Sequence, residues 1–549
     1  MRFSSAAIVI ISAVLAVCQA SAIILNKDLG VSCAPITYNA KSKLPATIEL
    51  YVDLITLEDP DKIKDFKLPV LIFRATDIYN FSNVPSIHEY NQEYYANWAD
   101  LHDLVVDGDK FKLVVERGYP QEIDTSRLLN SFAVLDTEEN SNTPQHVDVI
   151  FPVKETGLYC VYIAPPKEGL VELKVPIRYQ NSYGLLDFTG YCIYSQYKYL
   201  ISLGIAIFGY LFYYIVKMVG KDYSSMNSLS VMSKLTVFYL IPPIIMVHII
   251  DWILLGVKNK HIASSIDNKA FDFFEVVLRM VESLFGVYFN AIFLLFAMGY
   301  GVIYYHNGSR KYRELPLALL RKVKILFTIN AIAICIATFL FTNVLSPMYD
   351  PTLMPLFPEM LQQKKRSWLV SIIGSLALSL VLLLPMVWSI CSFYYFFQTK
   401  KLIAKFPPIQ SGNDDDVNER ITKSFKRSVI VIVGVPFFIF VVGIFAFGVQ
   451  SGLSNPEFFA KQYANEEQRL LAIFEYMVIG KRLPKMMFWA QILGYYFTVI
   501  IFYFIWVRGN NGLLVDNDPL QEYDEVTRYE VYSDDDSQSQ SQNSNSTTA

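Results

Sequence analysis

Two patterns of hydrophobic positions divide the chain. Between residues 23 and 190, short runs alternate apolar and polar positions, as strands with one buried face do. These runs are 46–55, 68–77, 110–118, 146–153, 157–166 and 170–179. Clusters of turn-forming residues separate them, and no long helical period intervenes. The total length suits two packed antiparallel sheets, so the pattern predicts an all-β sandwich.

From residue 199 onward, the apolar runs become long enough to cross a bilayer. A helix needs about 20 apolar residues to span a hydrocarbon core of about 30 Å. Seven runs meet this requirement: 199–220, 235–257, 283–305, 325–345, 368–397, 429–449 and 487–507. The second half therefore predicts an α-helical bundle with seven transmembrane spans.

The first 22 residues have the pattern of a cleaved signal peptide. They contain one cation, Arg2, then an apolar stretch too short to span a membrane, and small residues at Ala20 and Ala22. Cleavage would leave the β domain, 23–195, in the lumen. An odd number of spans in the bundle, 196–508, would then place the C-terminal tail, 509–549, in the cytosol.

Composition and charge add three constraints. With 53% hydrophobic and 18% charged residues, the chain is too apolar to be a string of soluble domains. Cations are modestly more frequent in the expected cytosolic loops than in the lumenal ones, which favours the same orientation. The acidic, low-complexity tail is predicted to be disordered and argues against nucleic acid as a partner.

Three cysteines precede the first expected span: Cys33, Cys160 and Cys192. An oxidising lumen favours one bridge among them. We prefer Cys33 with Cys160, because this pair would tie the first segment of the domain to a late strand. Cys192, close to the membrane, would be the odd one, although spacing alone does not determine connectivity.

Three glycosylation sequons occur in the chain. Asn80 is the acceptor within the β domain, where a loop between strands would present it to the lumen. The sequons at Asn307 and Asn545 fall in expected cytosolic segments, so we expect both to remain unmodified.

The sequence offers little for catalysis. The histidines of the β domain, His88, His102 and His146, do not have a metal-ligand spacing, and no nucleophile elbow or phosphate-binding glycine loop is present. We therefore expect no enzyme, no cofactor and no metal.

Ionisable residues beside the second and third spans suggest a polar network. His248 and Asp251 share one face of the second span, and Arg279 and Glu282 share a face at the start of the third. Both pairs would lie near the lumenal side, with Asn290 and Asn330 deeper in the bundle. The network is either a clasp between two helices or the polar lip of a cavity for a lipid, peptide or ion. His248, with an ordinary pKa of about 6.5, would also be suited to sensing lumenal pH.

The connection between the sixth and seventh spans contains a further helical period at residues 466–479. We expect a helix there that packs on the protein surface; a position on the membrane or as a lid over the mouth of the bundle is the alternative.

The tail contains two short motifs. Tyr523 and Val526 have the spacing of an adaptor sorting signal, and Ser533 and Ser537 have the acidic context favoured by acidophilic kinases. Phosphorylation there would add negative charge to a disordered segment without disrupting packing.

Two segments resemble the GOLD-domain seven-transmembrane proteins, also called the lung seven-transmembrane receptor family. One is Asn181-Ser-Tyr-Gly184-Leu-Leu186, just before the first span, and the other is Met298-Gly299-Tyr300-Gly301-Val-Ile303, closing the third. The family commonly has Trp-Arg-Pro at the exit of the seventh span, whereas this chain has Trp506-Val507-Arg508-Gly509. The paired glycines at 299 and 301 would permit close backbone approach or provide a regulated cytosolic contact, with Tyr300 at the headgroup level.

The resemblance implies a lumenal GOLD-like sandwich on a seven-helix bundle, in a protein of Golgi and endosome membranes, where fungal members of the family reside. It implies a role in sorting or recycling membrane cargo. Its partners would be membrane lipids, lumenal protein cargo and cytosolic coat adaptors. Two alternatives stay open: a ligand receptor that signals to cytosolic partners, and an ion-conducting or pH-regulating membrane protein. The third span ends in Gly-Tyr-Gly and lacks the Asp/Glu-Arg-Tyr signature of rhodopsin-like receptors.

Overall fold

The protein is described by a computed structural model. It describes residues 24–26, 30–51, 54–57, 66–86, 89, 102–115, 127–135, 147–165, 170–219, 234–261, 269–302, 316–340, 368–403, 417–451, 466–480 and 482–508. The expected signal peptide, the sequon at Asn307 and the tail residues Tyr523, Val526, Ser533 and Ser537 lie outside these ranges.

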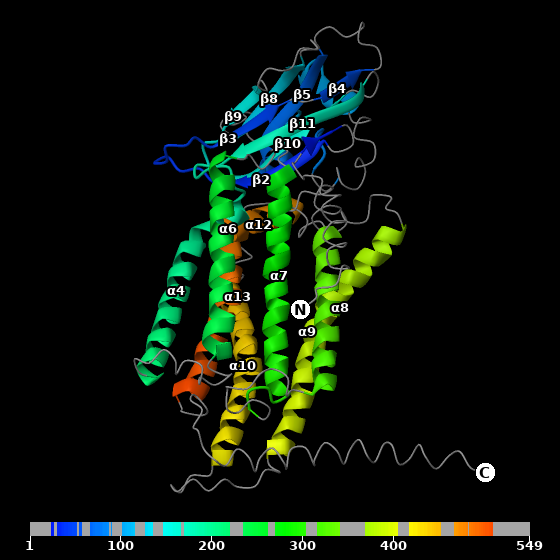
Figure 1. Ribbon diagram of the computed structural model, residues 1–549. Helices are drawn as coiled ribbons and strands as arrows, with labels where there is room; N and C mark the ends of the chain where they lie inside the picture. Colours follow the sequence, from blue (N-terminus) through cyan, green and yellow to red (C-terminus); the bar gives the residue numbers. More distant parts are fainter. Residues whose placement is uncertain are drawn as a thin grey trace, which may run out of the picture.

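The N-terminal region forms two main antiparallel sheets (Figure 1). The first has the order β1 (Ile24–Leu25), β11 (Leu170–Gln180), β3 (Thr47–Tyr51) and β9 (Val147–Pro152), with β4 (Leu54–Leu57) also paired to β11. The second has the order β2 (Val31–Ile36), β10 (Gly157–Ile163), β5 (Phe66–Arg74) and β8 (Leu128–Leu135). We call this region, together with the short elements packed on it, the β domain.

The core of the β domain lies between the two sheets. Alternate residues of β10, Tyr159, Val161 and Ile163, join apolar side chains from both sheets in one cluster. The intervening residues of β10 are buried in a second cluster on the outer face of their sheet. Because β10 is buried on both faces, its sequence is continuously apolar.

Three short elements accompany the outer face of this sheet: the 3-10 helix η2 (Ala75–Asn80), the helix α3 (His102–Val105) and the hairpin of β6 (Val106–Asp107) and β7 (Lys110–Phe111). Strands β2 and β8 were not expected from the sequence, and the described part of the expected run 110–118, residues 110–115, contributes the two residues of β7. Pro35 interrupts the strand pattern of β2, but an edge strand tolerates proline.

Helices occupy each of the seven expected ranges. They are α4 (Phe188–Val219), η6 (Leu235–Leu240) continuing into α6 (Ile241–His261), α7 (Lys269–Ala297), α8 (Leu317–Leu340), α9 (Trp368–Ile403), α10 (Val417–Ser451) and α13 (Leu483–Tyr503) with η12 (Phe504–Arg508). Four segments of the described chain are long and apolar enough to cross a membrane: Phe188–Lys217, Leu235–Lys260, Val276–Ala297 and Leu317–Phe339. The chain is thus a β-sheet region followed by helices suited to a membrane.

The ends of several helices differ from the expected spans. Helix α4 begins at Phe188, inside the expected β domain of 23–195, because polar and aromatic residues extend the helix beyond its apolar run. Helix α7 ends at Ala297, not at 305, because Gly299 adopts a left-handed conformation, with φ of 93°. The Tyr300 amide donates to Leu295 and the Gly299 amide to Phe296, which is the Schellman arrangement that ends a helix.

The helix expected at 466–479 is present as α12 (Glu466–Glu475), followed by the π-helical turn η11 (Tyr476–Gly480). Figure 1 shows α12 between the sheets and the long helices. Its apolar face packs on the outer cluster of the β domain, where Leu471 is fully buried. The helix therefore packs on the protein surface, as the favoured interpretation of its period predicts, and the sheet supplies the apolar contacts.

Candidate functional site: contacts between the β domain and the helices

The segment that joins the β domain to α4 is organised by the side chain of Asn181. Its Oδ1 accepts from the backbone amide of Thr37 (2.7 Å), and its Nδ2 donates to the carbonyl of Leu186 (3.0 Å). Its backbone also exchanges two hydrogen bonds with Gly184. With 1% of its surface exposed, Asn181 satisfies backbone groups that would otherwise be buried without partners.

Asn259, near the end of α6, forms hydrogen bonds with the same segment. Its Oδ1 accepts from the amide of Leu186 (3.1 Å), and its Nδ2 donates to the carbonyl of Tyr183 (2.9 Å). Its backbone carbonyl accepts from the amide of Leu185 (3.2 Å). The segment that resembles the family is therefore a joint between the β domain, α4 and α6, which we call the Asn181–Asn259 joint.

Sequence reasoning did not single out Asn259. A lone asparagine near the end of an apolar helix is a weak signal, because its partners are backbone groups about 75 residues earlier.

The helix α12 makes the second contact between the β domain and the helical region. Glu467, Leu471 and Glu475 are spaced by four residues and so lie along one face of α12. Leu471 fills the outer apolar cluster of the β domain between the two acidic positions. We call this stripe and its partners on the β domain the α12 contact.

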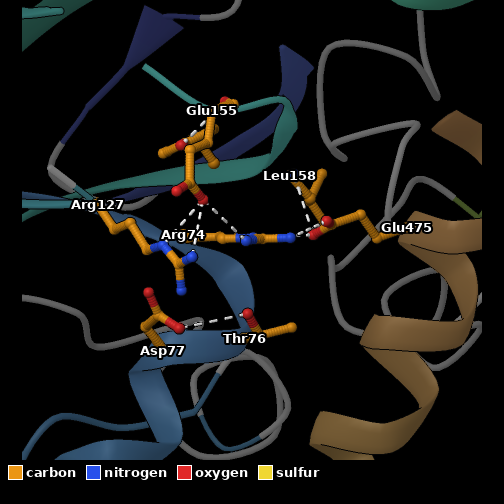
Figure 2. Close-up of polar contacts among 8 residues, drawn as sticks. Arg74, Thr76, Asp77, Arg127, Glu155, Leu158 and Glu475 are labelled. Carbon is orange, nitrogen blue, oxygen red and sulfur yellow. Dashed lines mark hydrogen bonds and ion pairs between the residues drawn. The ribbon is translucent and has the colours of Figure 1, made fainter. Parts of the chain in front are cut away.

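Arg74, at the end of β5, binds Glu475 at the C-terminal end of α12 (Figure 2). Its guanidinium forms an ion pair with Glu475, and the side chains are only 21% and 13% exposed. The backbone amide of Leu158 on β10 also donates to Glu475, at 3.2 Å. A half-buried guanidinium and a backbone amide together make a strong receptor for a carboxylate.

The opposite side of Arg74 is held by the β domain itself. One carboxylate oxygen of Glu155 lies 3.5 Å from the Arg74 guanidinium and 2.8 Å from that of Arg127 (Figure 2). The arginine that receives Glu475 is therefore oriented by its own domain.

Two further hydrogen bonds fix α12 to η2. Gln468, buried, donates from Nε2 to the carbonyl of Thr76 at 2.7 Å. The Tyr79 hydroxyl donates to Glu467 at 3.2 Å. Burial, followed by the nearby charge of Glu467, raises the pKa of Tyr79, so this hydroxyl keeps the proton that it donates.

Asp77 lies beside the α12 contact, where burial changes the pKa of its carboxyl. Burial raises its pKa, and the guanidinium groups of Arg127 and Arg74 lower it only in part. The folded state thus binds a proton more tightly than the unfolded state does. The contribution of Asp77 to stability therefore falls as pH rises through the raised pKa.

This shift predicts a pH-dependent effect of Asp77→Asn. Asparagine keeps an oxygen for the Thr76 hydroxyl, which donates to Asp77 at 3.4 Å, and carries no charge. Relative to wild type, the variant should gain melting temperature near pH 7 and lose that gain as the pH falls. Melting curves of the two proteins between about pH 4 and 8 test this. Asp107→Asn, at an exposed carboxyl on β6, is the control, and a difference independent of pH would contradict the assignment.

The structure brings two residues of the expected polar network into one pocket. The pocket lies between α6, α7 and α13 and is lined by Ile244, Val247, His248, Glu282, Phe285, Ile492 and Tyr495. His248 is 5% exposed, and its Nδ1 finds no hydrogen-bond partner among the described residues. A ring nitrogen and a carboxylate in one apolar pocket are suited to a proton, a cation or the polar group of a larger ligand.

The other expected members of the network are not among the residues that line this pocket. The Tyr197 hydroxyl is hydrogen-bonded to Asp251, and its ring lies 5.4 Å from that of His248. The charges of Asp251 and Arg279 both act on Glu282. Asn290 is half-buried on α7, and Asn330 is buried on α8 outside the pocket lining.

The remaining predicted residues have structural surroundings of their own. A disulfide joins Cys33 on β2 to Cys160 on β10, the pair preferred from the sequence, and Cys192 is a buried free thiol. Asn80 is half-buried at the end of η2. After Gly299 at the end of α7, Gly301 also has a positive φ, and the Thr399 hydroxyl of α9 donates to the carbonyl of Ala297 (2.7 Å). The described residues include no group of three or more histidine, cysteine or acidic side chains placed to hold a metal ion.

Comparison with known proteins assigns neither a family nor an activity. No protein-family profile matches the chain. An uncharacterized protein of Schizosaccharomyces pombe is 24% identical over 315 residues, which are 55% of this chain and 54% of that protein. The similarity thus spans about half the length of each protein.

Proposed function

We propose that the chain is a multi-pass protein of Golgi and endosome membranes that helps to sort or recycle membrane cargo, with the β domain in the lumen as its recognition part. This proposal places it in the GOLD-domain seven-transmembrane family, with seven spans and a cytosolic tail. The two sheets followed by membrane-type helices support the architecture. The segment that resembles the family, 181–186, forms the Asn181–Asn259 joint.

The observation that carries the proposal is the double attachment of the β domain to the helices. The Asn181–Asn259 joint and the α12 contact both restrain how the domain sits on the helices. A recognition domain on a flexible linker would bind cargo independently of the membrane part. A domain held at two places can instead pass the consequence of binding to the helices, and through them to a sorting signal in the tail.

The orientation is tested by glycosylation. We expect Asn80→Gln to remove a glycan and increase the gel mobility of the protein, because Asn80 belongs to the domain proposed to be lumenal. Removing glycans enzymatically from wild type should give the same mobility. Asn307→Gln is the matched control and should migrate as wild type. A mobility change in that control would reverse the proposed topology.

The trafficking role is tested by proximity labelling from a fusion at the C-terminus, together with imaging of the tagged protein. We expect coat adaptors and cargo receptors to be labelled in wild type, and Tyr523→Ala to redistribute the protein from Golgi and endosomes. Tyr532→Ala, in the same tail but without an apolar residue three positions later, is the control. Labelling of heterotrimeric G-protein subunits at the cell surface would instead favour a receptor.

The pocket at His248 and Glu282 favours a second candidate, an ion-conducting or pH-regulating membrane protein. Conductance of the purified protein in planar bilayers would discriminate the two. A current that His248→Gln or Glu282→Gln alters would support this candidate. The absence of any current across the bilayer would favour the sorting role.

A further inference from the structure

The α12 contact has the form of a receptor with a bound ligand. On the ligand side, one helical face presents acid, leucine and acid at intervals of four: Glu467, Leu471 and Glu475. On the receptor side, the β domain presents a tyrosine hydroxyl, an apolar cluster and an arginine in the matching order. We call this receptor surface, formed by η2 and the adjoining parts of β5 and β10, the helix-binding surface.

The β domain builds the helix-binding surface from its own residues. Glu155 and Arg127 orient Arg74, and the amide of Leu158 is a fixed part of strand β10. The disulfide pair and Phe73 belong to the apolar cluster that receives Leu471. The surface thus does not require α12 in order to be arranged for a carboxylate beside an apolar side chain.

The ligand, by contrast, depends on the surface. Helix α12 has ten residues, and helices of this length are marginal in water. Three side chains of α12 are buried, Gln468, Leu471 and Ala472, and Phe474 packs against the outer cluster, whereas Leu470 is 43% exposed. A short helix held by a few buried side chains and a few polar contacts can be displaced by a competing helix with the same stripe.

We propose that the helix-binding surface recognises acidic amphipathic helices of partner proteins, and that α12 occupies it within the chain until such a helix displaces it. The partner helix would carry two acidic residues eight positions apart with a large apolar residue midway. This inference rests on the proposed role of the β domain in recognition, and it names the class of cargo segment that the domain binds.

The test uses the full-length protein in detergent and a fluorescein-labelled peptide of residues 465–477 as the probe. The host protein carries Leu471→Ala, which weakens the internal competitor and leaves the surface intact. We expect the peptide to bind this variant at least tenfold more tightly than wild type, measured by fluorescence anisotropy. Leu470→Ala, one position away and off the stripe, is the matched host control and should bind the peptide as wild type does.

Two controls examine the surface itself. Adding Arg74→Gln to the Leu471→Ala host should weaken peptide binding at least tenfold, because the receptor for the carboxylate is lost. A peptide with Leu471→Asp and Glu475→Lys should not bind. If Leu471→Ala does not fold, Glu475→Gln serves as the weakened host.

Failure of the peptide to bind a folded host would overturn the inference, provided that hydrogen exchange shows α12 released from the surface. A peptide affinity that Arg74→Gln leaves unchanged would also overturn the inference. Both results concern the purified protein and do not depend on where it resides in the cell. Failure of the proposed function would appear separately, as an altered location or set of tail neighbours with peptide binding unchanged.

Discussion

Replacing Gly184 with alanine is expected to destabilise the Asn181–Asn259 joint strongly. The φ of Gly184 is +133°, a conformation that side chains rarely adopt. A Cβ atom at this position would lie 2.3 Å from Oδ1 of Asn259. Asn259 would have to move, and it holds three hydrogen bonds to the same segment.

These effects set the expected magnitude. Backbone strain of this kind costs on the order of 1–3 kcal/mol. Each hydrogen bond lost from the joint adds about 1 kcal/mol. We therefore expect Gly184→Ala to lower the free energy of unfolding by about 4 kcal/mol. For a domain of this size, that corresponds to a fall in melting temperature of roughly 10 °C.

Gly108→Ala is the matched control, because it introduces backbone strain without a steric clash of the new Cβ atom. Gly108 also has a positive φ, 64°, but a Cβ atom there would meet nothing within 4 Å. Its replacement should cost only about 1 kcal/mol, the strain of one left-handed residue. Melting of the detergent-solubilised proteins, followed by loss of the monodisperse gel-filtration peak, compares the two. Equal losses would show that Asn259 yields without penalty and that the joint is not rigid.

The order of strands and helices followed from local periodicity. The strands β3, β5, β9, β10 and β11 and every expected helix have apolar patterns that repeat every two residues or persist over a span. Strands β2 and β8 escaped prediction because Pro35 in β2, and Asn130 and Ser131 in β8, interrupt that pattern. Both are edge strands of their sheet, where weaker patterns are tolerated.

The contacts between the β domain and the helices could not be predicted. Arg74 and Glu475 are 401 positions apart, and nothing local in the sequence relates them. The period in 466–479 predicted a helix with an apolar face, but not the surface that the face would bury. His248 and Glu282 were placed together because a short loop joins their helices, and the structure indeed puts both on one pocket. The sequence could relate near neighbours on adjacent helices, but not elements joined only by the tertiary fold.

Removing the disulfide between Cys33 and Cys160 is the second change with a large expected effect. The bond closes a loop across 127 positions, and both residues are fully buried in the outer cluster. The chain-entropy account of disulfides gives about 5 kcal/mol for a loop of this length, and measured losses are commonly about 2–5 kcal/mol. We expect the double variant Cys33→Ala and Cys160→Ala to lower the unfolding free energy of the β domain within that range. Cys192→Ala, which removes a buried free thiol, is the control and should cost much less.

Hydrogen exchange of the double variant also distinguishes two views of α12. A disulfide acts mainly on the unfolded state, so amides of β2 and β10 that exchange only through global unfolding should lose protection. If α12 is a displaceable ligand, its amides exchange by local release from the β domain, which does not require the domain to unfold. Their protection should then stay near that of wild type. A parallel loss of protection in α12 and β10 would mean that the two elements unfold as one unit. A partner helix could then displace α12 only if the helix-binding surface itself unfolded, which would contradict the inference.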